Sequence, residues 1–100
     1  MIIKLSPYAP LPGADEYLSL SRAGDVLAVN GQPFDFTPLP EGGELPAEAI
    51  GSELFAGPVV RRNGRLELSL RFPLADDASA AARFPEPLLI DTDGPVELPR

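Results

Sequence analysis

Two Asn-Gly dipeptides, Asn30-Gly31 and Asn63-Gly64, limit the folds open to this chain more than any other feature. Asn-Gly supplies the two positive φ angles that a two-residue type I′ turn needs. Residues on both sides of each dipeptide favour extended backbone, and after the second one apolar and polar residues alternate. The apolar face there consists of Leu66, Leu68, Leu70 and Phe72. Both dipeptides therefore predict β-hairpins.

Proline and glycine argue for short elements throughout. Thirteen prolines and nine glycines are spread over 100 residues, and each proline removes a backbone donor and interrupts a helix. The length suits one ordinary domain. We therefore expect residues 1–100 to form a single, mainly β domain of antiparallel hairpins and meanders. A small sandwich or half-barrel with one or two short helical turns is the expected architecture.

Residues 17–22 and 25–29 predict the first pair of strands, because the former alternate polar and apolar side chains and the latter favour β structure. A two-residue loop at Ala23-Gly24 would place Arg22 opposite Asp25 and Leu20 opposite Leu27. Opposite charges would then meet at the turn and apolar side chains on one face. Alanine is a poor residue for such a turn, which counts against this register.

The turn at Asn30-Gly31 adds a third strand to this meander. It would place Leu27 opposite Phe34 on the apolar face. Pro33 lies within the third strand and has no amide hydrogen to donate to a neighbour. We therefore expect that strand at the edge of a sheet.

The hairpin at Asn63-Gly64 concentrates positive charge. Residues 61–71 hold four of the eight basic residues of the chain, and the two-residue turn places Arg62 opposite Arg65. Solvent and the nearby Glu67 would relieve this repulsion. Arg62 and Arg65 therefore mark either the solvated tip of a hairpin or a contact for an acidic protein or another anion.

Residues 37–57 have the composition of a long Pro/Gly-rich loop. Within it, residues 46–50 suit one helical turn that begins at Pro46 and ends at Gly51. The apolar residues Leu39, Leu45 and Phe55 allow two interpretations. Either the loop folds back and closes one end of the core, or these side chains bind a partner protein.

The C-terminal quarter predicts one short helix or loop and one hairpin. Residues 75–83 could form the helix, with Asp76 or Asp77 as its cap and Arg83 near its C-terminal end. Residues 88–90 and 96–98 flank a turn at 92–95 and predict a last hairpin.

Residues for catalysis and metal binding are scarce. The chain has no cysteine and no histidine, which excludes Ser-His-Asp and Cys-His nucleophile systems and the usual zinc sites. Carboxylate pairs occur at Asp15-Glu16 and Asp76-Asp77, but neighbouring acids in loops are usually hydrated. Asp91-Thr92-Asp93-Gly94 lacks the further ligands of a calcium loop. We predict no catalytic, cofactor-binding or metal-binding residue, and hence no enzyme.

The net charge of −7 disfavours nucleic acid as a partner, because phosphates would be repelled. No apolar run is long enough to cross a membrane. Residues 23–60 contain six acids and no base, which suits a basic protein partner. Those acids are Asp25, Asp35, Glu41, Glu44, Glu48 and Glu53. Nothing in the pattern indicates a homo-oligomer.

Several stretches together resemble a family of short, uncharacterised proteins encoded in bacteriophages and prophages. The resemblance rests on Asn30-Gly31, Phe34-Asp35-Phe36, Leu39-Pro40, Asn63-Gly64 and Asp93-Gly94-Pro95-Val96, and covers about residues 17–99. It implies a phage origin and a role in the tail module, but assigns no functional residue. Residues 6–14 match no pattern of that family.

These observations lead to one expected function and two alternatives. We expect a non-enzymatic structural or assembly protein of a phage tail that acts through contacts with another phage or host protein. The first alternative is an acidic regulator or mimic that binds a basic host protein. The second is an enzyme with converging carboxylates. We expect synthesis in the bacterial cytoplasm, with the virion as a further location.

Overall fold

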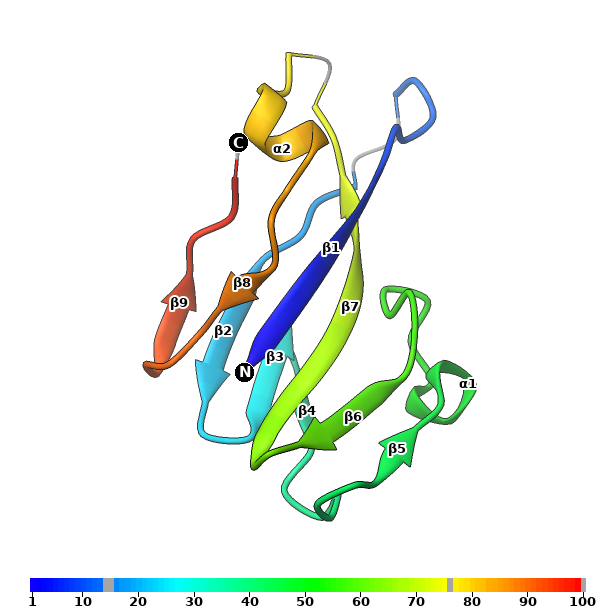
Figure 1. Cartoon of the computed structure of the whole chain (residues 1–100). Helices are drawn as coiled ribbons and strands as arrows, with labels where there is room; N and C mark the ends of the chain where they lie inside the picture. Colours follow the sequence, from blue (N-terminus) through cyan, green and yellow to red (C-terminus); the bar gives the residue numbers. More distant parts are fainter. Residues whose placement is uncertain (14–15, 76, 100) are drawn as a thin grey trace.

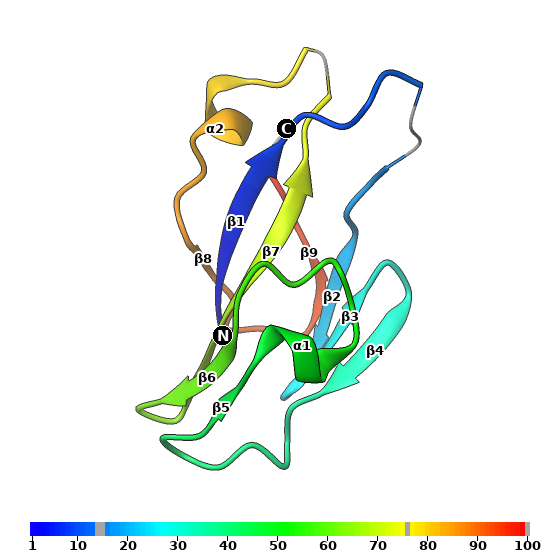
Figure 2. The same ribbon diagram turned by 90° about the vertical axis from the view of Figure 1, so that its right-hand side faces the viewer.

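The computed structural model consists of two β-sheets packed face to face, which confirms the expected mainly β fold (Figures 1 and 2). The structure describes residues 1–13, 16–75 and 77–99. One sheet contains, in spatial order, β5 (Glu44–Leu45), β6 (Val59–Arg62), β7 (Arg65–Pro73), β1 (Ile2–Tyr8) and β8 (Leu88–Leu89). The other contains β4 (Gln32–Asp35), β3 (Val26–Val29), β2 (Leu20–Ala23) and β9 (Gly94–Val96).

The core lies between the sheets and follows the alternation of apolar residues in the strands. In β7 the buried residues are Leu66, Leu68, Leu70 and Phe72, as the pattern after Asn63-Gly64 predicts. β1 contributes Ile3 and Leu5, and β3 contributes Leu27 and Val29. Since every second side chain of these strands points inward, one apolar face from each sheet meets the other.

Both Asn-Gly hairpins form with the predicted register. Asn30 and Asn63 have φ angles of 51° and 55°, and a glycine with positive φ follows each. Leu27 lies opposite Phe34, and Arg62 lies opposite Arg65. β4, which contains Pro33, is an edge strand as expected.

The register predicted for the β2–β3 hairpin is wrong by two residues. Leu27 lies opposite Arg22 instead of Leu20, and the turn consists of Gly24 and Asp25. Gly24 takes the first turn position with a φ of 61°, which is where a type II′ turn prefers glycine. A shift of two residues keeps the same side chains on the buried face, so the apolar pattern alone does not detect it.

The expected last hairpin is also wrong. β8 pairs with β1 in one sheet, while β9 pairs with β2 in the other. The chain between them crosses from sheet to sheet, and Asp93 holds this crossing by accepting a hydrogen bond from the Gly24 amide at 2.9 Å. Each half of the predicted hairpin therefore has a different neighbour.

A parallel pair at the centre of the five-stranded sheet was not expected. β1 and β7 run parallel in register from Ile2 opposite Glu67 to Tyr8 opposite Pro73. Antiparallel hairpins alone do not produce this pair, because parallel strands need a long connection. The fold is therefore mainly antiparallel around one parallel pair.

Residues 37–57 contain more structure than the expected loop. They include β5 and the helical turn α1 (Ala47–Ile50), which starts after Pro46 and ends at Gly51 as predicted. Phe55 then bridges to Leu70, and the Ala56 amide donates to the Ser69 carbonyl at 2.9 Å. This segment thereby covers the edge of β7 beyond β6.

The second helical turn, α2 (Ala80–Arg83), has a different cap from the expected one. The Ser79 hydroxyl accepts a hydrogen bond from the Ala82 amide at 3.2 Å, so Ser79 is the N-cap instead of Asp77. Asp76 lies outside the described residues. Arg83 is in the last turn, as predicted.

Candidate binding site

Two long connections of the fold meet at one end of the sandwich. Residues 9–19 join β1 to β2, and residues 74–87, which include α2, join β7 to β8. Figure 1 shows the described parts of both connections at the top of the molecule, while the β2–β3 and β6–β7 turns and the connection from β4 to β5 lie at the opposite end. Long connections on a rigid scaffold are where binding residues are commonly found.

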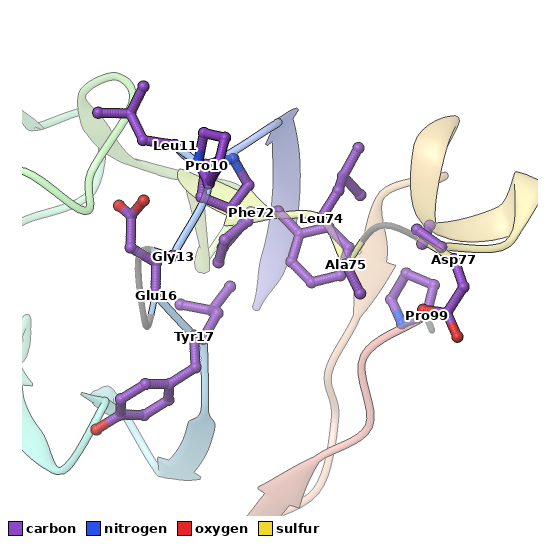
Figure 3. A pocket seen from close by; sticks show the side chains of 15 residues that line it. Pro10, Leu11, Gly13, Glu16, Tyr17, Phe72, Leu74, Ala75, Asp77 and Pro99 are labelled. Carbon is purple, nitrogen blue, oxygen red and sulfur yellow. The ribbon is translucent and has the colours of Figure 1, made fainter.

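These connections enclose an open pocket of about 790 Å³ (Figure 3). Leu18, Phe72 and Ala82 line it and are almost fully buried, so the bottom of the pocket is the top of the core. Pro10, Pro12, Pro73 and Pro99 also line it. Because proline has a fixed φ angle, these walls lose little freedom when a ligand binds. We call this hollow the end pocket.

Large apolar side chains remain exposed around the end pocket. Leu11 is 79% exposed and Tyr17 is 60% exposed, and both line it. On the other side of α2 lies a second hollow of about 560 Å³, where Phe84 is 80% exposed. Pro99 lines both hollows, so they adjoin each other at this residue. Gathered apolar exposure of this kind marks interaction surfaces.

Two carboxylates border the end pocket. Glu16 and Asp77 are the charged residues among the described residues that line it, and Figure 3 shows them on opposite sides. Glu16 accepts a hydrogen bond of 2.8 Å from the Tyr8 hydroxyl. The Arg71 guanidinium lies 4.3 Å from the centre of the Tyr8 ring. The hydrogen bond joins the Glu16 side chain to the end of β1.

Burial and the hydrogen bond to Glu16 raise the pKa of Tyr8 above its ordinary value, and the Arg71 charge opposes this shift. The neutral phenol is therefore the form that the folded protein favours. Its hydroxyl hydrogen is needed for the bond to Glu16.

The apolar residues singled out in 37–57 belong to the core rather than to an exposed loop. Phe55 is 5% exposed, and its ring meets those of Phe34 and Phe36 edge to face, at centroid distances of 5.0 and 6.1 Å. Leu39 and Leu45 are partly buried and pack against the same core. Of the two interpretations of this segment, the geometry favours closure of the core, and Phe55 has no free surface for a partner.

The tip of the Asn63-Gly64 hairpin makes hydrogen bonds and an ion pair with other residues of this chain. The Glu41 carboxylate accepts hydrogen bonds from the amides of Asn63 and Gly64. Arg62 pairs with Glu67 at 3.5 Å, which is the expected relief of its repulsion from Arg65. Arg65 stays exposed and lines a hollow of about 220 Å³ with Arg22 and Asp25. An external anion would have to compete with the chain's own carboxylates here.

Arg61 has a structural role that sequence patterns did not reveal. Its side chain is 12% exposed and lies on the inward side of β6, opposite Leu66. It donates to the carbonyl groups of Leu39 and Phe36 at 2.6 and 2.9 Å, and to Asp25 at 3.1 Å. The guanidinium therefore ties the five-stranded sheet to the turn and loop of the other sheet.

Three of the six acids in residues 25–53 are engaged in internal contacts. Asp25 pairs with Arg61, Asp35 accepts from the Thr37 amide at 2.9 Å, and Glu41 binds the hairpin tip. Hydrogen bonds from Thr37 lower the pKa of Asp35, although burial weakly opposes them. These three carboxylates stabilise turns and loops of this chain.

The described residues hold no group of three or more acidic or other ligating side chains that could bind a metal ion. Asp15 of the predicted carboxylate pair lies outside them. No helix in the same part of the chain is long and apolar enough to span a membrane.

Comparison with known proteins adds no relative: no protein-family model, no curated protein and no solved structure matches this chain.

Residues 10–13, which line the end pocket, were not identified from sequence patterns. The signal that could have drawn attention to them is local. Leu11 stands between Pro10 and Pro12, in a stretch too rich in proline for a strand or helix. Such a leucine has no regular element to bury it, and in the structure it is exposed.

Proposed function

We propose that this protein is a non-enzymatic binding protein that holds a segment of another protein at its end pocket, as a structural or assembly component of a phage tail. The observation that carries the proposal is the gathering of exposed apolar side chains there. Leu11 and Tyr17 line the pocket, and Phe84 lines the adjoining hollow, which shares Pro99 with it. Burying them against a partner would remove apolar surface from water, which is the main driving force of association.

The sheet edges support this choice because they discourage strand addition. Pro33 lies in β4 and Pro95 in β9, while Pro46 directly follows β5 and Pro87 directly precedes β8. Proline cannot donate to a neighbouring strand and is a common protection of edge strands. Both edge strands of the four-stranded sheet therefore contain a proline, and both edge strands of the five-stranded sheet are two residues long with a proline beside them. A partner is better accommodated by side-chain contacts in the pocket.

The pocket itself is tested by comparing matched substitutions of exposed leucines. Leu11 is 79% exposed at the pocket and Leu89 is 65% exposed in β8, so replacing either with serine should leave the core intact. Tagged wild-type protein and both variants are purified from the producing cells, and bound proteins are quantified by mass spectrometry. We expect one stoichiometric partner that Leu11→Ser loses and Leu89→Ser keeps. Retention of that partner by Leu11→Ser would overturn the proposal.

The role in a phage tail rests on the resemblance to phage and prophage proteins. Mass spectrometry of purified particles from a phage or prophage that encodes this chain tests it. A component of the finished tail is expected at a fixed ratio to a known tail protein. An assembly factor is expected in the cell, bound to a tail protein, and not in the particle. Binding to host proteins alone would contradict the tail assignment.

An acidic regulator of a basic host protein is less well supported. It needs free carboxylates on one face, and Asp25, Asp35 and Glu41 already accept hydrogen bonds within the chain. Glu44, Glu48 and Glu53 are exposed and available for such contacts. If this alternative holds, replacing all three with glutamine abolishes binding to the basic partner. If the partner binds at the end pocket, the same replacement leaves binding unchanged.

Glu16 and Asp77 also allow a hydrolytic enzyme to be considered, because paired carboxylates are the minimum for acid–base hydrolysis of glycosides. The exposed apolar side chains around them fit a bound protein segment better than a polar sugar. Hydrolysis of a glycoside by the purified protein, together with loss of that activity in Glu16→Gln, would contradict the non-enzymatic role.

A further inference from the structure

We infer that the end pocket selects a segment in which a bulky apolar side chain stands next to lysine or arginine. This inference rests on the proposed function and adds the chemistry of the partner. Its basis is the combination of an apolar bottom with a rim on which the charged side chains among the described residues, Glu16 and Asp77, are both acidic. The occupant is a segment of another protein.

The apolar part of the inference follows from the depth and composition of the pocket. Phe72 and Leu18 at its bottom are 4% and 3% exposed, so a side chain that enters meets the top of the core. The volume of about 790 Å³ accommodates several side chains. Leucine, phenylalanine or methionine would release the most water on entering.

The cationic part follows from the positions of the two carboxylates. Glu16 comes from the connection that follows β1 and Asp77 from the one that follows β7, so the pocket has an acid on each side (Figure 3). Both side chains belong to exposed residues. One Glu16 oxygen accepts from Tyr8, which leaves the other available to a ligand. A cation beside the apolar side chain would meet one of the two carboxylates, whichever direction the segment runs.

The surroundings favour a polypeptide over a small molecule. The second hollow, which Phe84 lines, shares Pro99 with the end pocket, so the hollowed surface is larger than the pocket alone. Small-molecule sites usually enclose most of the ligand. An extended segment could instead fill the pocket with one side chain and cover the neighbouring surface with others.

The test uses short synthetic peptides that share one central phenylalanine and differ only in its neighbours, which are lysine, glutamine or glutamate. Their affinity for the full-length protein is measured by fluorescence anisotropy at low and high salt. We expect the lysine peptide to bind best, by about threefold per ion pair over the glutamine peptide. We expect the difference to shrink at high salt, because exposed charges are screened.

Variants assign the preference to the pocket. Glu16→Gln combined with Asp77→Asn should remove the preference for lysine while phenylalanine still binds, since the amide oxygen of glutamine can still accept from Tyr8. Glu53→Gln is the matched control, because Glu53 is exposed and does not line the pocket. It should keep the preference.

The outcomes separate this inference from the function on which it rests. Equal binding of lysine and glutamine peptides that Leu11→Ser weakens would overturn the charge preference and leave the pocket as the binding site. Absence of binding to every peptide would also overturn the inference. Self-association that Leu11→Ser abolishes would assign the pocket to a second copy of this chain and overturn it as well. Retention of the cellular partner by Leu11→Ser would refute the proposed function itself.

Discussion

Arg61 and Asp25 connect the two sheets of this protein, with 3.1 Å between the Arg61 Nη2 and Asp25 Oδ2 atoms. Arg61 belongs to β6 and Asp25 to the turn between β2 and β3. The same guanidinium also donates hydrogen bonds to the carbonyl oxygens of Leu39 and Phe36. These two acceptors would lose this hydrogen-bond partner without Arg61.

Replacing Arg61 should therefore destabilise the fold far more than replacing its neighbour. We expect Arg61→Ala to lower the free energy of unfolding by about 2 kcal/mol, since it removes charged hydrogen bonds and leaves their acceptors behind. Arg62→Ala is the control: Arg62 is 66% exposed. It should cost about 0–1 kcal/mol. Urea unfolding measures both, and equal losses would show that the bridge between the sheets contributes little.

Neighbouring arginines with different roles show what strand patterns can and cannot predict. The turn at Asn63-Gly64 correctly places Arg62 opposite Arg65. Alternation then puts Arg61 on the inward side, where an apolar residue is expected. Its partners, Asp25 and the carbonyls of Phe36 and Leu39, lie more than twenty positions away in the chain. Hydrophobic periodicity holds no information on such distant polar contacts.

Substitution of Phe55 tests whether residues 37–57 close the core or bind a partner. Its ring is buried against Phe34 and Phe36. Phe55→Ala should therefore cost about 3–5 kcal/mol of stability, as is usual for large aromatic side chains in cores. Thermal unfolding followed by circular dichroism measures the change. A binding loop would instead give normal stability and impaired partner binding, and that result would refute the core assignment.

Glu41 should control the opening of the Asn63-Gly64 turn. Its carboxylate accepts from two successive amides, and glutamine at this position offers only one oxygen. We expect Glu41→Gln to cost about 1 kcal/mol and to speed hydrogen exchange at the amides of residues 63 and 64. NMR-detected exchange provides the measurement, with Glu53→Gln as the control. Unchanged protection of both amides would mean that water replaces the carboxylate without loss.

The contact between Glu41 and the Asn63-Gly64 turn shows why the sequence alone did not decide the role of the hairpin tip. Turn chemistry predicted the hairpin, because Asn-Gly is a local signal. Nothing local relates Glu41 to Asn63, which is 22 positions further along the chain. Likewise, the parallel pairing of β1 with β7 joins residues 65 positions apart, so the center of the five-stranded sheet could not be read from neighbouring residues. The end pocket depends on that pairing, because its two walls follow β1 and β7.

Tyr8 should make stability depend on alkaline pH. Its pKa is raised in the folded protein, chiefly by burial and by the hydrogen bond to Glu16, relative to an ordinary value of 10.0. A raised pKa means that the stabilising contribution is complete below pH 10 and is lost as the pH rises through the folded-state pKa. Unfolding measured between pH 9 and 12 should show this loss in the wild type and in Tyr17→Phe, but a smaller loss in Tyr8→Phe. Identical profiles for the two variants would exclude Tyr8 as the cause.

The central claim is that a partner protein binds at the end pocket, and site-specific photo-cross-linking in the producing cell tests it most directly. A photoreactive amino acid is placed at position 11 in the pocket, at position 32 on the edge strand β4, or at position 65 on the hairpin tip. Each position is exposed. We predict a single strong adduct from position 11 and none from the other two. An adduct from position 32 or 65 without one from position 11 would contradict the claim and move the binding surface to a sheet edge or the basic hairpin.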